Sequence, residues 1–356
     1  MHCKRRWVGR SVEEVMVNEF KANPPEYYRA ALRDGRITVR GNASCLRDGD
    51  VIEHIAHRHE PPVVARVVVV ANDARVVAVD KPPSMPMHPC GSYHYNTLAS
   101  VLRFEHGIEA RQVHRLDKLT SGLVVLAKTA AVARELCEAI GGGLARKTYL
   151  ARVSGDFPNN APKAKLLDKE PSPKRLKGES EAAAAARAME GTWRPVGDAL
   201  EVNVSIACKS HKDGVYECSP DGRPSQTRFR RLRSFDDDGT TLVECSPMTG
   251  RTHQIRLHLQ WLGHPIANDA CYGGKTVDLM EPTALIFREE EDSLSSRFSE
   301  ETEDAAAIVA RRECERCRAP PDETGPHPRS IWLHALRYAA GETWSYETDP
   351  PPWAGS

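Results

Sequence analysis

The stretch QVHRLDKLTSGLVVLAK, residues 112–128, joins a polar loop to an apolar run and bears most directly on the fold. The five apolar residues 123–127 are typical of a strand, and the Thr-Ser-Gly before them is typical of a turn. One carboxylate, Asp117, lies in the loop between the cations of Arg115 and Lys118. The sequence therefore places a single acid where a loop is about to enter a strand.

Asp117 has two interpretations. A loop aspartate often accepts hydrogen bonds from the backbone that follows it, which would make Asp117 a turn residue. A carboxylate kept ionised by a neighbouring arginine can instead point into a cleft and take part in chemistry. The choice between these interpretations depends on which other residues of the chain could act together with Asp117.

Composition limits the class of protein. The 356 residues can form one large domain with an appendage or two domains, and 49 Lys and Arg balance 49 Asp and Glu, so no global basic field indicates a nucleic-acid partner. Ten Cys without regular spacing indicate reduced thiols in an intracellular protein. The apolar runs are too short to span a membrane. We expect a monomer in the cytoplasm, with the nucleus and the mitochondrion as alternatives.

Strand and helix signals continue outward from this stretch. Helix patterns occur at 97–107, 130–140 and 251–263. The segment 66–83 contains two Val-rich strand patterns joined by an Asn-Asp turn, and further strand patterns occur at 123–129, 147–155, 199–208, 226–235, 240–247 and 331–339. Short turns between neighbouring strands indicate antiparallel pairing. We predict an α+β fold with a mixed, largely antiparallel sheet and flanking helices, which excludes a Rossmann fold.

The N-terminal residues form a separate pattern, which we predict to be a module with its linker at 1–62, before a catalytic domain at 63–356. Two helix patterns, 11–20 and 24–35, precede two short strand patterns. This order resembles the S4-type RNA-binding fold, although a purely structural cap fits as well. His57 and His59, beside paired prolines, are expected to be surface residues.

Two segments, near 158–192 and 288–312, lack apolar periodicity and are expected to be mobile insertions. The pair Cys314 and Cys317 has zinc-knuckle spacing, with His327 beyond it. Since a second cysteine pair is not close by, we expect reduced thiols and no metal, and the sequence leaves this point open.

Common catalytic templates are absent, because the chain contains no phosphate-binding loop, H-E-x-x-H or G-x-S-x-G signature. Two other stretches add chemistry to Asp117. Residues 248–274 bring Arg251, His253 and Gln254 to the start of a helix that also carries Arg256. Alternation in the strand at 147–155 puts Tyr149 on one face with Lys147 and Ala151.

Four motifs in order, HRLDKLTSG, KTYLARVSG, GRTHQIRLHLQWLGHPI and LHALRY, resemble those of the RluA-type RNA pseudouridine synthases, over about three quarters of the chain. These enzymes convert uridine in RNA into its C5-glycosyl isomer. The segments NEFKANPPEYYRAALRDGRITVRG, KPPSMPMHPCGSYHYNTL and WSYETDPPPWA resemble the eukaryotic subgroup that modifies tRNA. One departure is Asn268, where the family usually has Gly, and asparagine tolerates the left-handed backbone angles expected there.

The resemblance implies roles for the site residues. The isomerisation needs no energy source and no net redox change, so no cofactor and no metal are expected. Asp117 would attack the sugar or assist departure of the base, and the glycal, acylal and base-attack routes stay open. Arg256, with Arg251 as second choice, would keep Asp117 charged, while Tyr149 and Leu333 would contact the uracil and Tyr149 could help remove the C5 proton. The residues expected to bind substrate are Arg115, Arg251, His253, Gln254 and Leu333.

RNA is the expected partner, and tRNA in particular. A target uridine has to be flipped out, which costs least in a loop, so position 32 of the anticodon loop is the predicted target. Arg228 and Arg230 share one face of a strand and are expected to bind phosphates, unless they are charges that protect a sheet edge. The alternatives are an inactive RNA-binding protein of this fold, a synthase acting on rRNA or mRNA, and an aspartate-dependent phosphotransferase or hydrolase.

Overall fold

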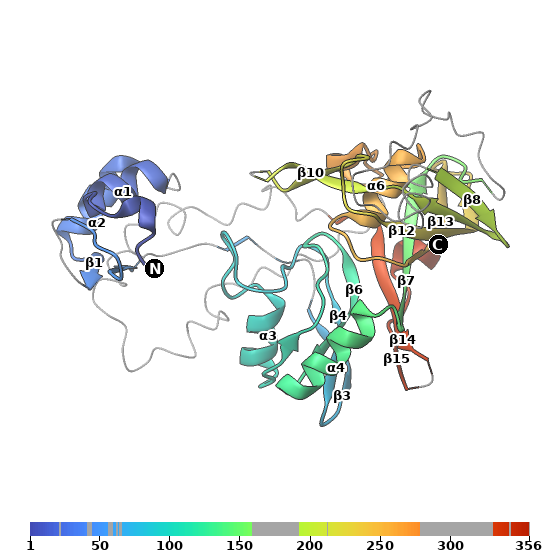
Figure 1. Ribbon diagram of the computed structural model, residues 1–356, viewed down its shortest axis with the longest axis horizontal. Coiled ribbons are helices and arrows are strands. Elements are labelled where there is room, and N and C mark those ends of the chain that lie inside the picture. The colour runs from blue at the N-terminus through green and yellow to red at the C-terminus, as the bar shows by residue number, and fades with distance from the viewer. Residues whose placement is uncertain are drawn as a thin grey trace, which may run out of the picture. The chain divides into compact units, whose positions relative to one another are not determined.

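A computed structural model (Figure 1) describes residues 1–20, 23–40, 45–55, 60–61, 63, 66–158, 192–211, 213–277, 330–341 and 343–355. These residues form two compact units, one within Met1–His59 and the other within Glu60–Phe287 and Pro326–Ser356. Each unit has its own hydrophobic core.

The N-terminal unit packs helices on a two-stranded sheet. Its elements are η1 (Arg5–Trp7), α1 (Val12–Glu19), α2 (Pro25–Arg33), β1 (Ile37–Arg40) and β2 (Val51–His54), and the two strands are antiparallel. Ser11 caps α1 by accepting the N–H of Glu14, and α2 begins with Pro25, where a helix has no need of the missing N–H. Trp7, Met16 and Ile52 lie in its core. An S4-like identity for this unit stays a prediction.

The second unit contains an eleven-stranded sheet. Its strands are β3 (Val68–Asn72), β4 (Val76–Lys81), β5 (Arg111–Gln112), β6 (Ser121–Ala127), β7 (Ala145–Ser154), β8 (Thr192–Val196), β9 (Ala199–Asn203), β12 (Gln226–Phe235), β13 (Thr240–Pro247), β14 (Leu333–Ala340) and β15 (Trp344–Glu347). The order is β3-β4-β6-β14-β7-β13-β12-β9-β8, with β15 on β14 and β5 on β6. Only β6 and β14 pair in parallel within the described sheet, which confirms the predicted mixed, largely antiparallel topology.

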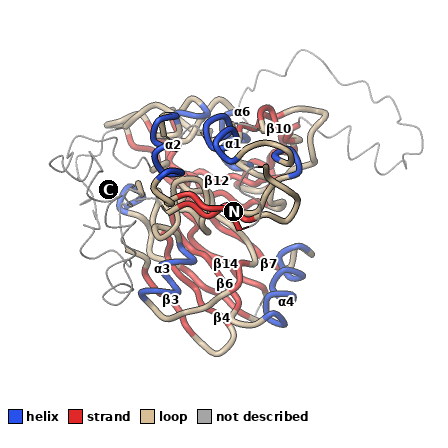
Figure 2. Tube along the Cα trace, turned by 90° about the vertical axis from the view of Figure 1, so that its left-hand side faces the viewer, coloured by secondary structure: helices blue, strands red, loops and turns tan. Residues whose placement is uncertain are grey.

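Helices and one hairpin complete the second unit. They are α3 (Leu98–Glu105), α4 (Ala130–Gly141), α6 (Gln254–Trp261), η2 (Ala270–Tyr272), α9 (Pro352–Gly355) and the hairpin β10 (Ile206–Ser210) and β11 (Val215–Cys218). Figure 2 shows α3 and α4 flanking the strands β4 and β6. None of the described helices is long and apolar enough to cross a membrane.

The parallel contact between β6 and β14 explains one glycine of the opening stretch. Gly122 lies opposite Ala335, and a Cβ atom at this position would lie 2.3 Å from the Ala335 carbonyl oxygen. Gly122 also has a φ of 108°, which side chains rarely adopt. The Thr-Ser-Gly segment therefore lets two strands, distant in sequence, meet beside Asp117.

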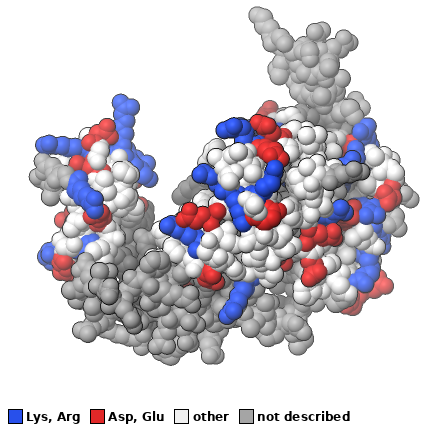
Figure 3. All heavy atoms as spheres, turned by 90° about the horizontal axis from the view of Figure 1, so that it is seen from below, with Lys and Arg blue, Asp and Glu red and all other residues white. Residues whose placement is uncertain are grey.

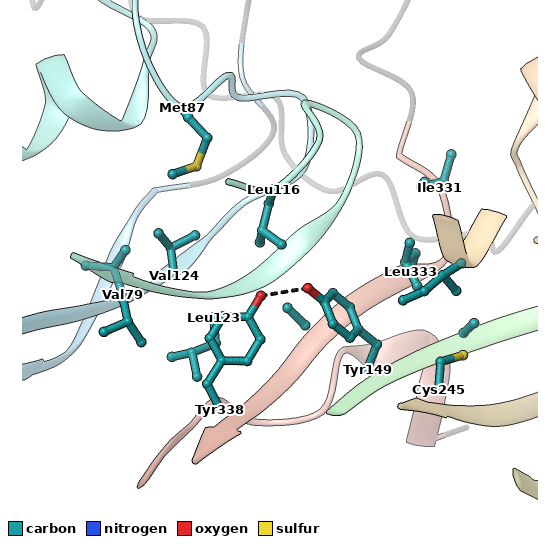
Figure 4. Packing of buried hydrophobic residues seen from close by; sticks show 14 of the residues in the cluster. Val79, Met87, Leu116, Leu123, Val124, Tyr149, Cys245, Ile331, Leu333 and Tyr338 are labelled. Atoms are coloured by element: carbon teal, nitrogen blue, oxygen red, sulfur yellow. Dashed lines mark hydrogen bonds between the residues drawn. The ribbon is translucent and has the colours of Figure 1, made fainter. Parts of the chain in front are cut away.

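The core of this unit lies along the centre of the sheet (Figure 4). Val79, Leu123 and Val124 are fully buried, and each such side chain contributes about 1.5–3 kcal/mol of hydrophobic stabilisation. Tyr149 and Tyr338 point toward each other from β7 and β14 in the same cluster. Strand β6 leads from the Asp117 loop directly into this core.

The sequence-based assignment differs from the structure in four short strands and one break. Strands β5, β8, β11 and β15 were not predicted, and the predicted strand at 199–208 is two strands. The chain leaves the large sheet at Val204, whose carbonyl accepts from the Ser225 hydroxyl and from His258 rather than from a neighbouring strand. It then forms the β10–β11 hairpin.

Several predictions fall outside the described residues. Nearly all of the insertion predicted near 158–192, all of the one near 288–312, and the residues His57, His59, Cys314, Cys317 and His327 belong to this group. They stay predictions.

Candidate active site

Asp117 lies in the loop between β5 and β6, with its side chain 22% exposed. Its backbone carbonyl accepts the N–H of Thr120, so the backbone forms the turn and leaves the carboxylate free for other contacts. Carboxylate oxygen Oδ2 lies 3.5 Å from Nη1 of Arg256 and 3.6 Å from Nε2 of His253. Asp117 therefore points at two nitrogen-bearing side chains from the 248–274 segment, and not at its own turn.

Arg256 lies on α6 and is almost completely buried. Its Nε and Nη2 donate to Oδ2 and Oδ1 of Asp269 at 2.6 and 2.8 Å, and the guanidinium lies over the ring of Tyr272. Burial opposes the charge of Arg256, but the bonds to Asp269 and the nearby Asp117 outweigh it and raise its pKa. The structure thus holds a permanent cation next to Asp117, and Arg256, the first choice from the sequence, is the arginine in contact.

His253 precedes α6 with a φ of 57°, in the left-handed region. Its Nδ1 lies 2.6 Å from the Tyr272 hydroxyl, and the ring of Tyr216 from β11 meets its ring edge-on. Burial lowers the pKa of His253, although the charge of Asp117 opposes this shift. The imidazole is therefore uncharged at neutral pH.

Gln254 and Arg251 lie at the turn before α6 in different surroundings. Gln254 is buried, and its carboxamide accepts from Thr249 and the Arg251 N–H while donating to Gln226 and Thr227. These hydrogen bonds hold the turn in place, and the expected substrate binding by Gln254 and Arg251 stays a prediction. Arg251 is exposed, and its Nε donates to the carbonyl of Pro224.

Tyr149 occupies the middle of the sheet, opposite Cys245 of β13 and Ala335 of β14. Its hydroxyl lies 2.7 Å from that of Tyr338, and Leu333 of β14 lies beside it in Figure 4. Burial raises the pKa of Tyr149 to about 12, and the charge of Asp117 adds to this rise. Tyr149 is therefore a neutral phenol close to Asp117, which does not suit the removal of a C5 proton and suits contact through its ring.

Lys81 is a site residue that the sequence analysis missed. It ends β4 fully buried, and its Nζ donates to the carbonyls of Pro82, Met85 and Lys118 at 2.9, 3.0 and 3.4 Å. Burial lowers the pKa of Lys81 to about 7, while the charge of Asp117 acts in the opposite direction. Three carbonyl acceptors match the three N–H groups of the ammonium form, so these contacts favour the protonated amine and tie the Asp117 loop to β4. A lysine at the end of the Val-rich run VVAVDK was the available signal.

Asp269 and Tyr272 were also missed, although both lie in the segment 248–274 that the sequence analysis singled out. A carboxylate that follows a helix carrying a buried arginine was the available signal for Asp269. The neighbouring Asn268 has a φ of 65°, so the left-handed backbone expected there is present. Its side-chain oxygen accepts the N–H of Val277 and fixes this turn.

The remaining arginines divide into two groups. Arg115 is exposed, and its charge contributes to lowering the pKa of His253, which places it near the site. Arg228 and Arg230 instead form ion pairs with Glu201 and Glu244 at 2.7 and 2.8 Å. Figure 3 shows cationic and anionic side chains mixed over the face in view. The two β12 arginines therefore have much of their charge offset by carboxylates.

The site as a whole surrounds the Asp117 carboxylate with the buried Arg256 cation, the neutral His253 imidazole and the buried Tyr149 phenol. Within the described ranges, no three His, Cys, Asp or Glu side chains gather as metal ligands would. Such a set can support nucleophilic attack by a carboxylate, or its assistance to a leaving base, next to an aromatic ring.

Comparison with known proteins gives consistent matches. The family described as RNA pseudouridylate synthase matches residues 75–261. RNA pseudouridine synthase 7 of Arabidopsis thaliana is 35% identical over 364 residues, which cover 99% of this chain and 83% of that protein. The mitochondrial tRNA pseudouridine(32) synthase of Saccharomyces cerevisiae is 31% identical over 99% of this chain and 74% of its own length. The tRNA pseudouridine(31) synthase of the same yeast is 30% identical over 99% of this chain and 92% of its own length.

Proposed function

The chain belongs to the RNA pseudouridylate synthase family and is therefore an isomerase, and we propose that its substrate is a uridine in the anticodon stem-loop of tRNA. Within that stem-loop, position 32 is the proposed target. The observation that carries the proposal is the contact of Asp117 with Arg256, in a chain that matches two yeast tRNA enzymes over 99% of its length.

The choice of position 32 rests on two supports. One relative acts at position 32 of tRNA by its name, and the other at position 31. Position 32 lies in the anticodon loop, where a base leaves its stack at lower cost than a paired base does. We therefore place position 32 first, and position 31 is the alternative that the experiment below distinguishes.

Asp117 is proposed to be the catalytic carboxylate. It would attack the sugar or assist departure of the base when the bond between N1 and C1′ breaks. The uracil would then rotate, and C5 would bond to C1′ while the C5 proton is lost and N1 gains a proton. This series of steps conserves all atoms and electrons, and the Arg256 cation, 3.5 Å from Oδ2, would hold the carboxylate in orientation.

Tyr149 and Leu333 are proposed to hold the detached uracil. Both come from adjacent strands, β7 and β14, and lie in the cluster of Figure 4. An aromatic ring stabilises a base by stacking without fixing its rotation about the ring normal, which the reaction needs. Since Tyr149 is a neutral phenol, proton removal from C5 is assigned to another base.

The test uses the purified chain and three RNAs: a minimal anticodon stem-loop, the full tRNA and an rRNA hairpin with a uridine in its loop. Pseudouridine at position 32 of the first two is the expected result, mapped by mass spectrometry of nuclease fragments. A stem-loop in which cytidine replaces uridine 32 is the matched control. Product at position 31, or in the rRNA hairpin alone, would contradict the target while leaving the reaction intact.

A further inference from the structure

The Tyr272 hydroxyl has two hydrogen-bond partners, and they differ in what they can offer. The N–H of Tyr216 points at the hydroxyl oxygen at 3.2 Å and can only donate. The other partner is Nδ1 of His253 at 2.6 Å, which can either donate or accept. The hydroxyl can donate its own proton only to Nδ1 of His253, because a backbone N–H is a donor and cannot accept a hydrogen bond.

Burial raises the pKa of Tyr272 to about 12, so the hydroxyl keeps its proton at neutral pH and can serve as the donor. His253 is neutral because burial lowers its pKa. A neutral imidazole whose Nδ1 accepts a hydrogen bond carries its single proton on Nε2. Nε2 is the atom that faces the Asp117 carboxylate, where a proton is electrostatically favoured.

We propose that Tyr272 fixes His253 in the Nε2–H tautomer, so that His253 and Arg256 both present N–H groups to Oδ2 of Asp117 and leave Oδ1 as the reactive oxygen. This inference rests on the proposed role of Asp117. His253 is then a positioning residue for Asp117 and not, as the sequence analysis expected, a ligand for the RNA.

The distances fit this division of the carboxylate. The contacts to Oδ2, 3.5 and 3.6 Å, are long for hydrogen bonds, so they act mainly as charge and dipole contacts that favour one orientation. Among the described residues, no hydrogen bond to Oδ1 is present. An oxygen without a donor keeps its lone pairs available for bond formation, which a nucleophile or base requires.

Two substitutions at His253 separate this role from a purely structural one. The amide nitrogen of glutamine can reach the place of Nε2, whereas that of the shorter asparagine replaces Nδ1. The backbone at this position has a φ of 57°, and asparagine tolerates this region better than glutamine. A structural role therefore favours His253→Asn, and the proposed role favours His253→Gln.

The experiment measures single-turnover rates at saturating anticodon stem-loop, together with RNA affinity and the unfolding midpoint. We expect His253→Gln to stay within about tenfold of the wild type and His253→Asn to fall about 100-fold, as misplacement of a reacting group would cause. Tyr272→Phe, which keeps the ring over Arg256, should be slowed as well. All three variants should bind RNA as the wild type does.

A second readout does not depend on turnover. In protein labelled with ¹⁵N-histidine, the His253 signals of the wild type should show a protonated Nε2 and an unprotonated Nδ1, and Tyr272→Phe should abolish this preference. A wild-type Nδ1–H tautomer, an Asn variant at least as fast as the Gln variant, or a loss of RNA affinity in both would overturn the inference. A wild-type protein that modifies no RNA would instead refute the proposed function, while the tautomer could still be read.

Discussion

Replacing Asp269 by Asn tests how strongly the structure holds Arg256 in place. The two side chains are 2% and 5% exposed and share two hydrogen bonds of 2.6 and 2.8 Å. Asparagine keeps the shape but removes the charge, so the Arg256 guanidinium stays buried over the Tyr272 ring with Asp117, at 3.5 Å, as its remaining anionic contact. Removing one partner of a buried ion pair costs about 3–5 kcal/mol. This is a large share of the total stability of a domain, about 5–15 kcal/mol.

Thermal unfolding followed by tryptophan fluorescence measures this cost. For a unit of this size, 1 kcal/mol corresponds to about 2–4 °C in Tm, so Asp269→Asn should lower Tm by roughly 6–20 °C. Activity at a temperature where the variant is folded should also fall, about 100-fold, because Arg256 is no longer oriented.

A matched control is Glu135→Gln, which makes the same chemical change in an exposed pair. Glu135 meets Arg75 at 2.7 Å, but both side chains are more than half exposed, so the expected cost is about 0–1 kcal/mol. If Asp269→Asn costs no more than Glu135→Gln, the reasoning that Asp269 anchors Arg256 is wrong.

Three further predictions address the ring, the arginines and the pH dependence. Tyr149→Phe should stay more active than Tyr149→Leu, because the ring holds the base; equal losses in two variants that still bind RNA would assign the role to the hydroxyl. Replacing both Arg228 and Arg230 by Ala should reduce the slope of log K for RNA binding against log salt concentration by less than about one unit, because carboxylates already pair with both arginines. A reduction of the slope by about two units would mean that both arginines bind phosphates. Burial lowers the pKa of His258 from 6.5 to about 4, so as the pH falls this imidazole is protonated in the unfolded chain before it is protonated in the folded chain. The stability from this residue is complete above pH 6.5 and is lost as the pH falls toward 4, by about 1.4 kcal/mol per unit. Urea unfolding at pH 7 and pH 4.5 should show a smaller loss in His258→Gln than in the wild type.

Much of the fold follows from local patterns in the chain. Helices α1, α2, α3 and α4 have clear start or stop signals, and the long strands β6, β7, β12, β13 and β14 have strong apolar or alternating patterns. The short strands were not predicted because their formation depends on pairing with neighbouring strands, which local sequence patterns do not show. Strand β8 contains Pro195, which is tolerated because β8 ends the described sheet order.

The site could be predicted only in part for the same physical reason. Asp117, Arg256 and Tyr149 lie in recognisable motifs, and in the structure Arg256 contacts Asp117. The roles of Lys81 and Asp269 become clear only in the folded structure, because the function of a buried charge depends on what surrounds it. Gln254 has a recognisable position but no free hydrogen-bonding group, which sequence alone does not reveal.

Conversion of a minimal anticodon stem-loop by wild type and Asp117→Asn is the most direct test of the central claim. The substitution removes the charge and keeps the shape, so pseudouridine should be undetectable while RNA affinity and Tm stay near those of the wild type. Asp198→Asn, the same change at an exposed carboxylate beside Arg230, should leave turnover unchanged. Turnover by folded Asp117→Asn near the wild-type rate would contradict the assignment of Asp117 as the catalytic carboxylate.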